Sequence, residues 1–211
     1  MKKRKGKVLI DSNILIFATE YKIINVFQLI DALYDEVYIH KMVYDELLLN
    51  EVKQNVDAKL KDGWILFDPD DEVTLSDDIY EIYNRYLVDV KQGFDDQNEK
   101  KKREGRPLKH TNDLGEMHCL AAAMLLGASI IFSNDYDIRE IIQDSKLCIT
   151  VDEAEESVLI QHDTLLDFCC YLVVFEIETK SNVREFLKAI QPLKVSGLDE
   201  RLKQLLPKET S

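Results

Sequence analysis

The sequence predicts an α/β fold, an α/β/α sandwich in which a central, mainly parallel β-sheet is covered by helices on both faces. Over residues 7–150, short apolar runs alternate with segments of helical periodicity, and two of the runs stop abruptly at acidic turns. Such alternation places successive strands parallel and the helices across both faces of the sheet. Residues 152–211 carry helical patterns, which predicts a C-terminal helical extension.

The first elements follow in the order strand, helix, strand, helix. Residues 7–10 (KVLI) are mostly apolar and stop at Asp11, as a buried parallel strand does at its carboxyl end. Apolar side chains recur at helical spacing over residues 23–33, residues 37–39 are strand-like, and residues 42–49 are again helical.

A segment without apolar periodicity follows a helix predicted over residues 76–90. From residue 91 to about residue 111 the chain contains two glycines, a proline and many charged side chains. This composition predicts a charged, mobile loop. Because a loop of such length is uncommon in a compact domain unless it is functional, we expect a lid or a loop that grips the substrate.

The remaining elements place a second acidic turn after a strand. A helix over residues 113–126 stops at a glycine, residues 129–132 form a strand, and Asp135 lies just beyond its carboxyl end. After one more strand over residues 147–150, we expect helices only. The predicted domains are a main domain over residues 1–151 and a helical extension over residues 152–211.

Composition limits the compartment and the class of partner. The four cysteines form no CxxC pair and show no zinc-like spacing, which is typical of core thiols in a reducing compartment. No apolar run resembles a signal peptide or approaches the roughly 20 residues of a membrane span, so we expect a cytoplasmic protein without membrane contact. The net charge of −13 disfavours nonspecific adhesion to nucleic acid.

Basic residues are nevertheless clustered. Residues 2–7 form one cluster, and the predicted loop carries a second. The second cluster is the better candidate for contact with a phosphate backbone, and a merely solvated loop is an equal alternative. The predicted nucleic-acid-binding residues are Lys100, Lys101, Lys102, Arg103, Arg106 and Lys109.

Several acidic residues lie where a divalent cation could be held, although each has an ordinary structural alternative. Asp11 and Asp135 follow strands and could be turn or cap residues. Glu46 could lie on an exposed helix face, and Asp113 with Glu116 could form a capping box. Carboxylates gathered at the carboxyl ends of parallel strands would instead suit Mg²⁺ or Mn²⁺, which prefer oxygen ligands.

Taken in order, these segments resemble the PIN-domain family over roughly residues 7–150. Four motifs in sequence carry the resemblance, although none alone is as specific as a P-loop. They are residues 8–13 (VLIDSN), 43–47 (VYDEL), 112–118 (NDLGEMH) running into 121–123 (AAA), and 130–135 (IIFSND).

The resemblance implies a metal site and its ligands. Asp11, Glu46, Glu116 and Asp135 would be the catalytic acids that bind Mg²⁺ or Mn²⁺, with Asp113 and Asp137 as auxiliary ligands and Ser12, Asn13 and Ser133 as supporting residues. His118 is an unattractive general base, because two residues beyond Glu116 it points to another face of the helix.

The resemblance also implies a function. A PIN-like nuclease domain over residues 1–151 would cleave single-stranded or structured RNA through metal-activated water, leaving a 5′-phosphate and a 3′-hydroxyl. The protein could be the toxin of a toxin–antitoxin pair, with an antitoxin or another protein as partner, and could form a homodimer. The alternative is a catalytically silent PIN fold that binds proteins. A haloacid-dehalogenase-like phosphatase would also begin with a strand followed by an aspartate. It needs a second acid at the position of Asn13, so the sequence disfavours it.

Overall fold

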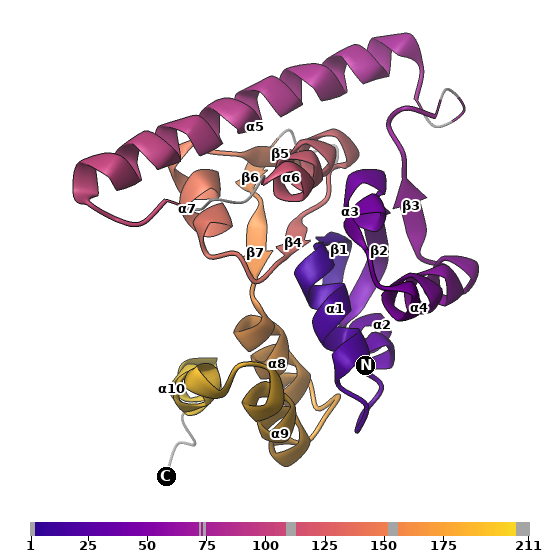
Figure 1. Cartoon of the computed structure of the whole chain (residues 1–211), viewed down its shortest axis with the longest axis vertical. Helices are drawn as coiled ribbons and strands as arrows, with labels where there is room; N and C mark the ends of the chain where they lie inside the picture. Colours follow the sequence, from indigo (N-terminus) through magenta and orange to yellow (C-terminus); the bar gives the residue numbers. More distant parts are fainter. Residues whose placement is uncertain (1–2, 72, 74, 109–112, 152–155, 206–211) are drawn as a thin grey trace.

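Five parallel strands form the central sheet in the computed structural model, which describes residues 3–71, 73, 75–108, 113–151 and 156–205. The strand order is β3-β2-β1-β4-β7. Figure 1 shows this sheet among helices, with a group of helices at the C-terminal end, so the predicted fold class is confirmed. The strands are β1 (Arg4–Ile10), β2 (Tyr34–His40), β3 (Ile65–Phe67), β4 (Ile130–Phe132) and β7 (Gln161–Asp163).

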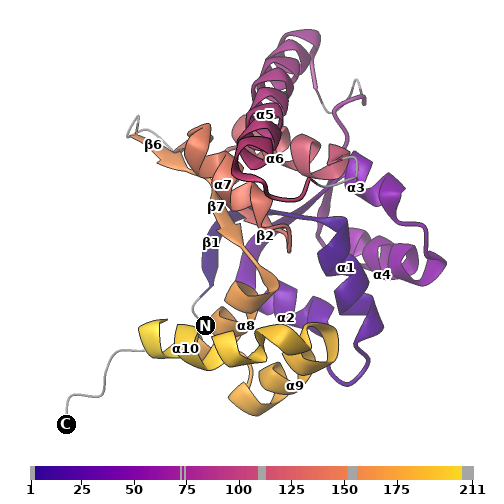
Figure 2. The same ribbon diagram turned by 60° about the vertical axis from the view of Figure 1, so that its left-hand side comes forward.

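Helices lie on both sides of the sheet. Figures 1 and 2 show it between a layer containing α5, α6 and α7 and a layer containing α2 and α8. Even α5, at 28 residues, is not apolar enough to cross a membrane, and this holds for every described helix. The helices are α1 (Ser12–Glu20), α2 (Val26–Leu33), α3 (Lys41–Glu46), α4 (Asn50–Lys61), α5 (Asp77–Glu104), α6 (Leu114–Leu126), α7 (Asp137–Asp144), α8 (Leu165–Val174), α9 (Lys180–Ile190) and α10 (Val195–Leu205).

The central strand β1 positions the first acidic turn. Its last three residues are apolar and fully buried, as expected for a strand covered on both faces. It pairs in parallel with β2 on one side and with β4 on the other, and Ile10 is in register with Phe132. Because both strands end at that level, Asp11 and Ser133 emerge side by side at the carboxyl edge of the sheet.

The predicted loop from residue 91 is wrong as far as Glu104, because α5 continues through that segment. Its buried face includes Val90, Phe94, Gln97 and Lys101, which recur at helical spacing. Two of those four side chains are polar, and so apolar periodicity does not reveal the helix. The helix ends at Glu104 and is followed by Gly105, whose φ of 68° suits a left-handed residue after a helix. Residues 109–112 lie outside the described part of the chain.

The expectation that strands end before residue 152 is also wrong. The predicted strand at 147–150 exists as β5 (Cys148–Val151), but it pairs with β6 (Glu156–Leu159) in a separate antiparallel sheet. The fifth strand of the central sheet is β7, which has the polar sequence QHD and therefore lacks the apolar signal of a buried strand. The central sheet thus includes residues beyond the predicted boundary at 151, while α8–α10 are helical as predicted.

Candidate metal centre

Asp11 is buried at the carboxyl end of β1, and neighbouring donors fix its carboxylate. Oδ1 accepts hydrogen bonds from the backbone N–H of Ser12 at 2.7 Å and from the Ser12 hydroxyl at 3.4 Å. Oδ2 accepts hydrogen bonds from the Ser133 hydroxyl at 2.9 Å and from the Asn13 side-chain amide. Ser12 and Asn13 therefore contact the Asp11 carboxylate as predicted, and Ser133, the third predicted supporting residue, contacts it as well.

The turn after β4 is tied to the turn after β1. The Asn134 N–H donates to Asn13 Oδ1 at 3.2 Å, and the Asp135 N–H donates to Ser133 Oγ at 3.1 Å. Asp135 Oδ1 in turn accepts the N–H of Asp137 at 2.9 Å. These bonds hold two acidic side chains from distant parts of the sequence at one edge of the sheet, and both are largely buried.

Three carboxylates converge at this edge. Asp113, Glu116 and Asp135 each offer one oxygen, and these oxygens lie within 4.8 Å of one another. Asp113 and Glu116 are three residues apart at the start of α6, so they share a helix face. Since metal–oxygen distances run from about 2.0 to 2.6 Å, oxygens on opposite sides of one cation lie about 4–5 Å apart. The three side chains therefore fit a hard divalent cation, and Asp113 belongs to the group directly.

Asp11 and Glu46 complete the acidic surroundings. The Ser12 hydroxyl, which contacts Asp11, also lies 3.5 Å from Glu46 Oε2. Burial raises the pKa of Glu46, and the charge of Asp11 raises that pKa further, whereas the N–H of Gly115 and the Ser12 hydroxyl oppose the rise. A bound cation would relieve this repulsion between carboxylates.

The pKa of the Cys119 thiol reflects the same concentration of negative charge. Burial raises the pKa of its thiol well above the ordinary value, and the charges of Asp11, Glu116 and Glu46 add to that effect. These acids therefore lie close to one buried side chain on α6. The thiol stays protonated near neutral pH, which makes Cys119 unsuited to act as a nucleophile.

Gly115 has a structural role that its place in the motif did not indicate. A Cβ atom at this position would lie 2.8 Å from Glu46 Oε2 and 3.0 Å from Oε1. Only glycine allows the Glu46 carboxylate to reach the N-terminal turn of α6 and accept the N–H of Gly115. A close approach of this kind becomes visible only once α3 and α6 are placed against each other.

Gly115→Ala is expected to weaken Mn²⁺ binding by roughly 10–100-fold, the usual effect of disturbing residues that orient metal ligands. The methyl group would displace the flexible end of Glu46, while alanine itself favours the helix by up to about 1 kcal/mol. Calorimetric Mn²⁺ titration and thermal unfolding measure the two effects.

Gly197→Ala is the matched control. Gly197 also lies in a helix, α10, and an added Cβ would lie at an ordinary 3.4 Å from the Leu166 side chain of α8. Unchanged Mn²⁺ affinity in Gly115→Ala would contradict the role given to Glu46.

Asp137 and three of the predicted nucleic-acid-binding residues, Lys100, Lys101 and Arg106, form ion pairs between α5 or its C-terminal end and α7. Asp137 pairs with Lys101 and is not a member of the three-acid group. Much of the positive charge predicted for phosphate contact is thus matched by acids of α7, and the nucleic-acid role stays a prediction. The other ion pairs of these residues are Lys100 with Asp144 and Glu140, Lys102 with Glu99, and Arg106 with Glu104 and Glu140. Arg103 lines a cavity between α5 and α7, and Lys109 lies outside the described residues.

His118 belongs to a row of three hydrogen-bonded side chains, and its place there does not suit a general base. Its Nδ1 lies 2.6 Å from the Tyr83 hydroxyl, which lies 2.9 Å from His40 Nε2. His40 Nδ1 accepts the N–H of Met42, so the neutral ring donates from Nε2 to Tyr83, and Tyr83 donates to His118. Burial lowers the pKa of His40 to about 3 and also lowers that of His118. Both rings therefore stay neutral and pack between α5, α6 and the sheet.

Comparisons with known proteins add one structural match. No model of a protein family matches the chain, and no curated protein matches it. Among solved structures, the chain is similar to a chain of the VapBC2 complex from Rickettsia felis bound to a DNA fragment from its promoter. The match has 12% identity and a TM-score of 0.33, and it covers 64% of this chain and 92% of that chain. With identity and TM-score this low, the match implies nothing about function.

Proposed function

We propose that this protein is a Mg²⁺- or Mn²⁺-dependent nuclease that hydrolyses phosphodiester bonds, with RNA as its substrate. The observation that carries the proposal is the convergence of Asp113, Glu116 and Asp135 within 4.8 Å, beside the buried Asp11. Several carboxylates at the carboxyl edge of a parallel sheet would repel one another without a cation. Phosphodiester hydrolysis is the chemistry that such oxygen-rich sites commonly support.

The residues divide the work between ligation and positioning. Asp113, Glu116 and Asp135 would hold the cation, with Asp11 and Glu46 adjoining it. Ser133 and Asn13 orient Asp11 through its Oδ2, and Gly115 orients Glu46 through its N–H. A bound divalent cation lowers the pKa of a water ligand and polarises a phosphoryl oxygen.

No protein nucleophile is needed for this reaction. The one cysteine near the acids, Cys119, is buried and protonated, and the neutral His118 is engaged with Tyr83. Attack by water at phosphorus, with the 3′-oxygen as leaving group, yields a 5′-phosphate and a 3′-hydroxyl. Those ends distinguish this reaction from RNA cleavage by the neighbouring 2′-hydroxyl, which leaves a cyclic phosphate.

The biological setting that we propose is a toxin–antitoxin pair. Its support is the resemblance of residues 7–150 to PIN-domain nucleases, many of which are such toxins. An antitoxin would then be the protein partner, and single-stranded or structured RNA the substrate. A homodimer is compatible with this role.

Incubation with end-labelled single-stranded RNA tests the activity. We expect cleavage with Mn²⁺ or Mg²⁺, no cleavage with EDTA, and products whose 5′ ends can be ligated because they carry phosphate. Products with 2′,3′-cyclic phosphate, or cleavage that EDTA does not stop, would contradict the proposal. Mn²⁺ binding without cleavage of RNA or DNA would favour the catalytically silent binding module.

A further inference from the structure

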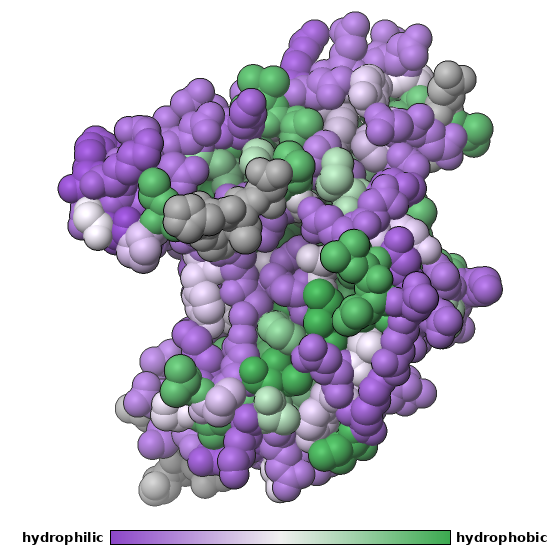
Figure 3. Space-filling model, viewed as in Figure 1, coloured by the Kyte–Doolittle hydropathy of each residue, from purple (hydrophilic) through white to green (hydrophobic). Residues whose placement is uncertain are grey.

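A second cavity lies at the free edge of β7, away from the acidic cluster. It has a volume of about 320 Å³ and is bounded by β7, α7, α8 and α10. Figure 3 shows the molecule hollowed on this side, between the part that contains α7 and the part that contains α8–α10. Such a volume is at the lower end of the range for small-molecule sites.

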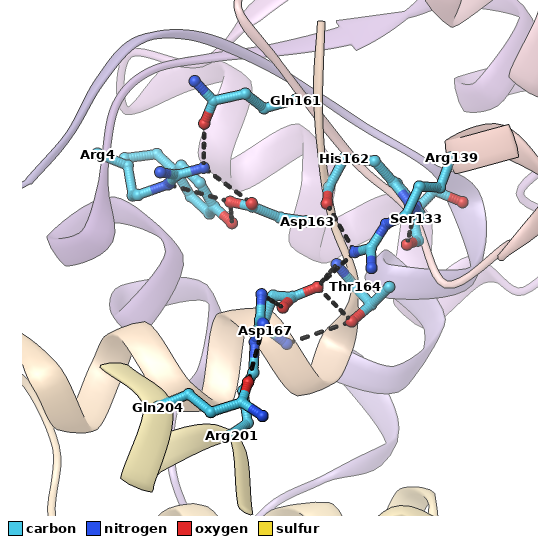
Figure 4. Close-up of polar contacts among 11 residues, drawn as sticks. Arg4, Ser133, Arg139, Gln161, His162, Asp163, Thr164, Asp167, Arg201 and Gln204 are labelled. Carbon is cyan, nitrogen blue, oxygen red and sulfur yellow. Dashed lines mark hydrogen bonds and ion pairs between the residues drawn. The ribbon is translucent and has the colours of Figure 1, made fainter. Parts of the chain in front are cut away.

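Three arginines from separate elements line this cavity, and Figure 4 shows their polar contacts. Arg4 comes from β1, Arg139 from α7 and Arg201 from α10. The other charged lining residues are Asp163 and Asp167, so the cavity carries an excess of one positive charge in a chain whose net charge is −13. A local positive site of this kind attracts a small anion.

The two carboxylates hold the guanidinium groups without using all their donors. Arg139 donates from Nη2 to Asp167 at 3.0 Å and to the His162 carbonyl at 3.2 Å. Arg4 donates from Nε to Asp163 and from Nη2 to Asp163 and Gln161. Within the described part of the chain, Arg139 Nε and Nη1 and Arg4 Nη1 make no hydrogen bond. The side chains of Arg139 and Arg201 are 43% and 39% exposed, so their donors are within reach of a ligand.

His162 supplies an independent indication of a ligand. The residue is buried, lines the cavity and donates from Nε2 to the Ser133 carbonyl at 2.8 Å. Its Nδ1 is buried and has no hydrogen-bond partner among the described residues. A buried polar atom without a partner is costly, and in this neutral ring Nδ1 accepts a hydrogen bond. A ligand with an O–H that reaches Nδ1 would satisfy this atom, while its other oxygens would accept from the arginines.

We propose that this cavity binds a phosphate group that carries a proton, either as inorganic phosphate or as the terminal phosphate of a nucleotide. Its oxygens accept from the arginines, whose planar guanidinium groups suit phosphate. The second pKa of a phosphate monoester is about 6, so at pH 6.5 part of its population keeps a proton, and we propose that the site selects this form through an O–H donated to His162 Nδ1. Sulfate has the same shape but no such proton near neutral pH. Tyr171 also lines the cavity, and the centroid of its ring lies 4.4 Å from Cζ of Arg4.

Isothermal titration of the full chain with phosphate at pH 6.5, in EDTA and at constant ionic strength, tests the proposal. We expect saturable binding at one site, with weaker binding of sulfate. Arg139→Gln and Arg201→Gln should each weaken binding roughly tenfold or more, because a hydrogen bond to a charged group is lost. Arg184→Gln, which removes an exposed arginine that pairs with Asp199, should have no effect.

Asp11→Asn should also leave phosphate binding unchanged, which separates this cavity from the acidic cluster and from the proposed nuclease activity. Tighter binding of AMP than of phosphate assigns the site to nucleotides, and the reverse assigns it to the free anion. The proposal is overturned if no saturation occurs below about 1 mM. It is overturned equally if both folded arginine variants, checked by circular dichroism, keep wild-type affinity or if sulfate binds as tightly as phosphate.

Discussion

Asp135→Asn is expected to abolish most of the thermal stabilisation that Mn²⁺ gives the wild-type protein. In the proposed site Asp135 is one of three ligating carboxylates, and an amide oxygen is a neutral and weaker ligand. We expect Mn²⁺ affinity to fall by on the order of 100-fold or more. At a concentration of 100 times the wild-type Kd, the cation stabilises the wild type by about 2.7 kcal/mol, and the variant should lose most of that stabilisation.

Without metal the effect of the same substitution should change sign. Asparagine can keep the hydrogen bond from the Asp137 N–H, while the repulsion among Asp135, Asp113 and Glu116 is reduced. The variant should therefore unfold at the same temperature as the wild type or higher in EDTA. The exposed Asp45, beside Glu46, provides the matched control, and Asp45→Asn should behave like the wild type with Mn²⁺. A full Mn²⁺ shift in Asp135→Asn would refute the assigned ligand.

Arg4→Met is expected to lower the free energy of unfolding by about 3–5 kcal/mol, the usual cost of leaving one partner of a buried ion pair uncompensated. Asp163 is 3% exposed at its side chain and accepts from Arg4 Nη2 at 2.8 Å and from the Tyr34 hydroxyl at 3.0 Å. Methionine would fill much of the volume and remove the charge, which isolates the electrostatic effect. Urea unfolding at pH 8 measures the loss.

The loss of unfolding free energy in Arg4→Met should be larger at high pH than at low pH. Burial raises the pKa of Asp163 above its ordinary value, and Arg4 and the Tyr34 hydroxyl oppose that rise. Without Arg4 the folded-state pKa rises further, so stability in the variant falls as pH rises through that pKa. Below the unfolded value of about 3.9 the carboxyl is protonated in both states, and the deficit shrinks. An equal deficit at pH 8 and near pH 5 would contradict this account.

The central part of the fold was predictable because its strands are apolar and end in acids. β1 and β4 were visible from residues 7–10 and 129–132, and the α/β class followed from their alternation with helices. The predicted grouping of Asp11 with Asp135 rested on strand-end placement, and the parallel pairing of β1 with β4 places them together.

The missed elements share a polar sequence whose structure depends on distant contacts. β7 has no apolar residue, and the end of α5 buries Gln97 and Lys101 against acids of α7. The periodicity of a local segment does not indicate partners that are distant in the sequence. The same reason applies to Gly115, whose importance depends on the approach of Glu46 from another helix, and to the arginine-lined cavity, which draws on both ends of the chain.

The most direct test of the metal-dependent nuclease is the rate of Mn²⁺-dependent cleavage of single-stranded RNA by Asp11→Asn beside Asp45→Asn. Asparagine at residue 11 can keep the bond from Ser12 while losing the charge beside the proposed cation. We predict a rate at least 100-fold below wild type for Asp11→Asn, corresponding to about 2.7 kcal/mol of lost transition-state stabilisation, and a wild-type rate for Asp45→Asn. Equal rates for the two folded variants would contradict the assignment.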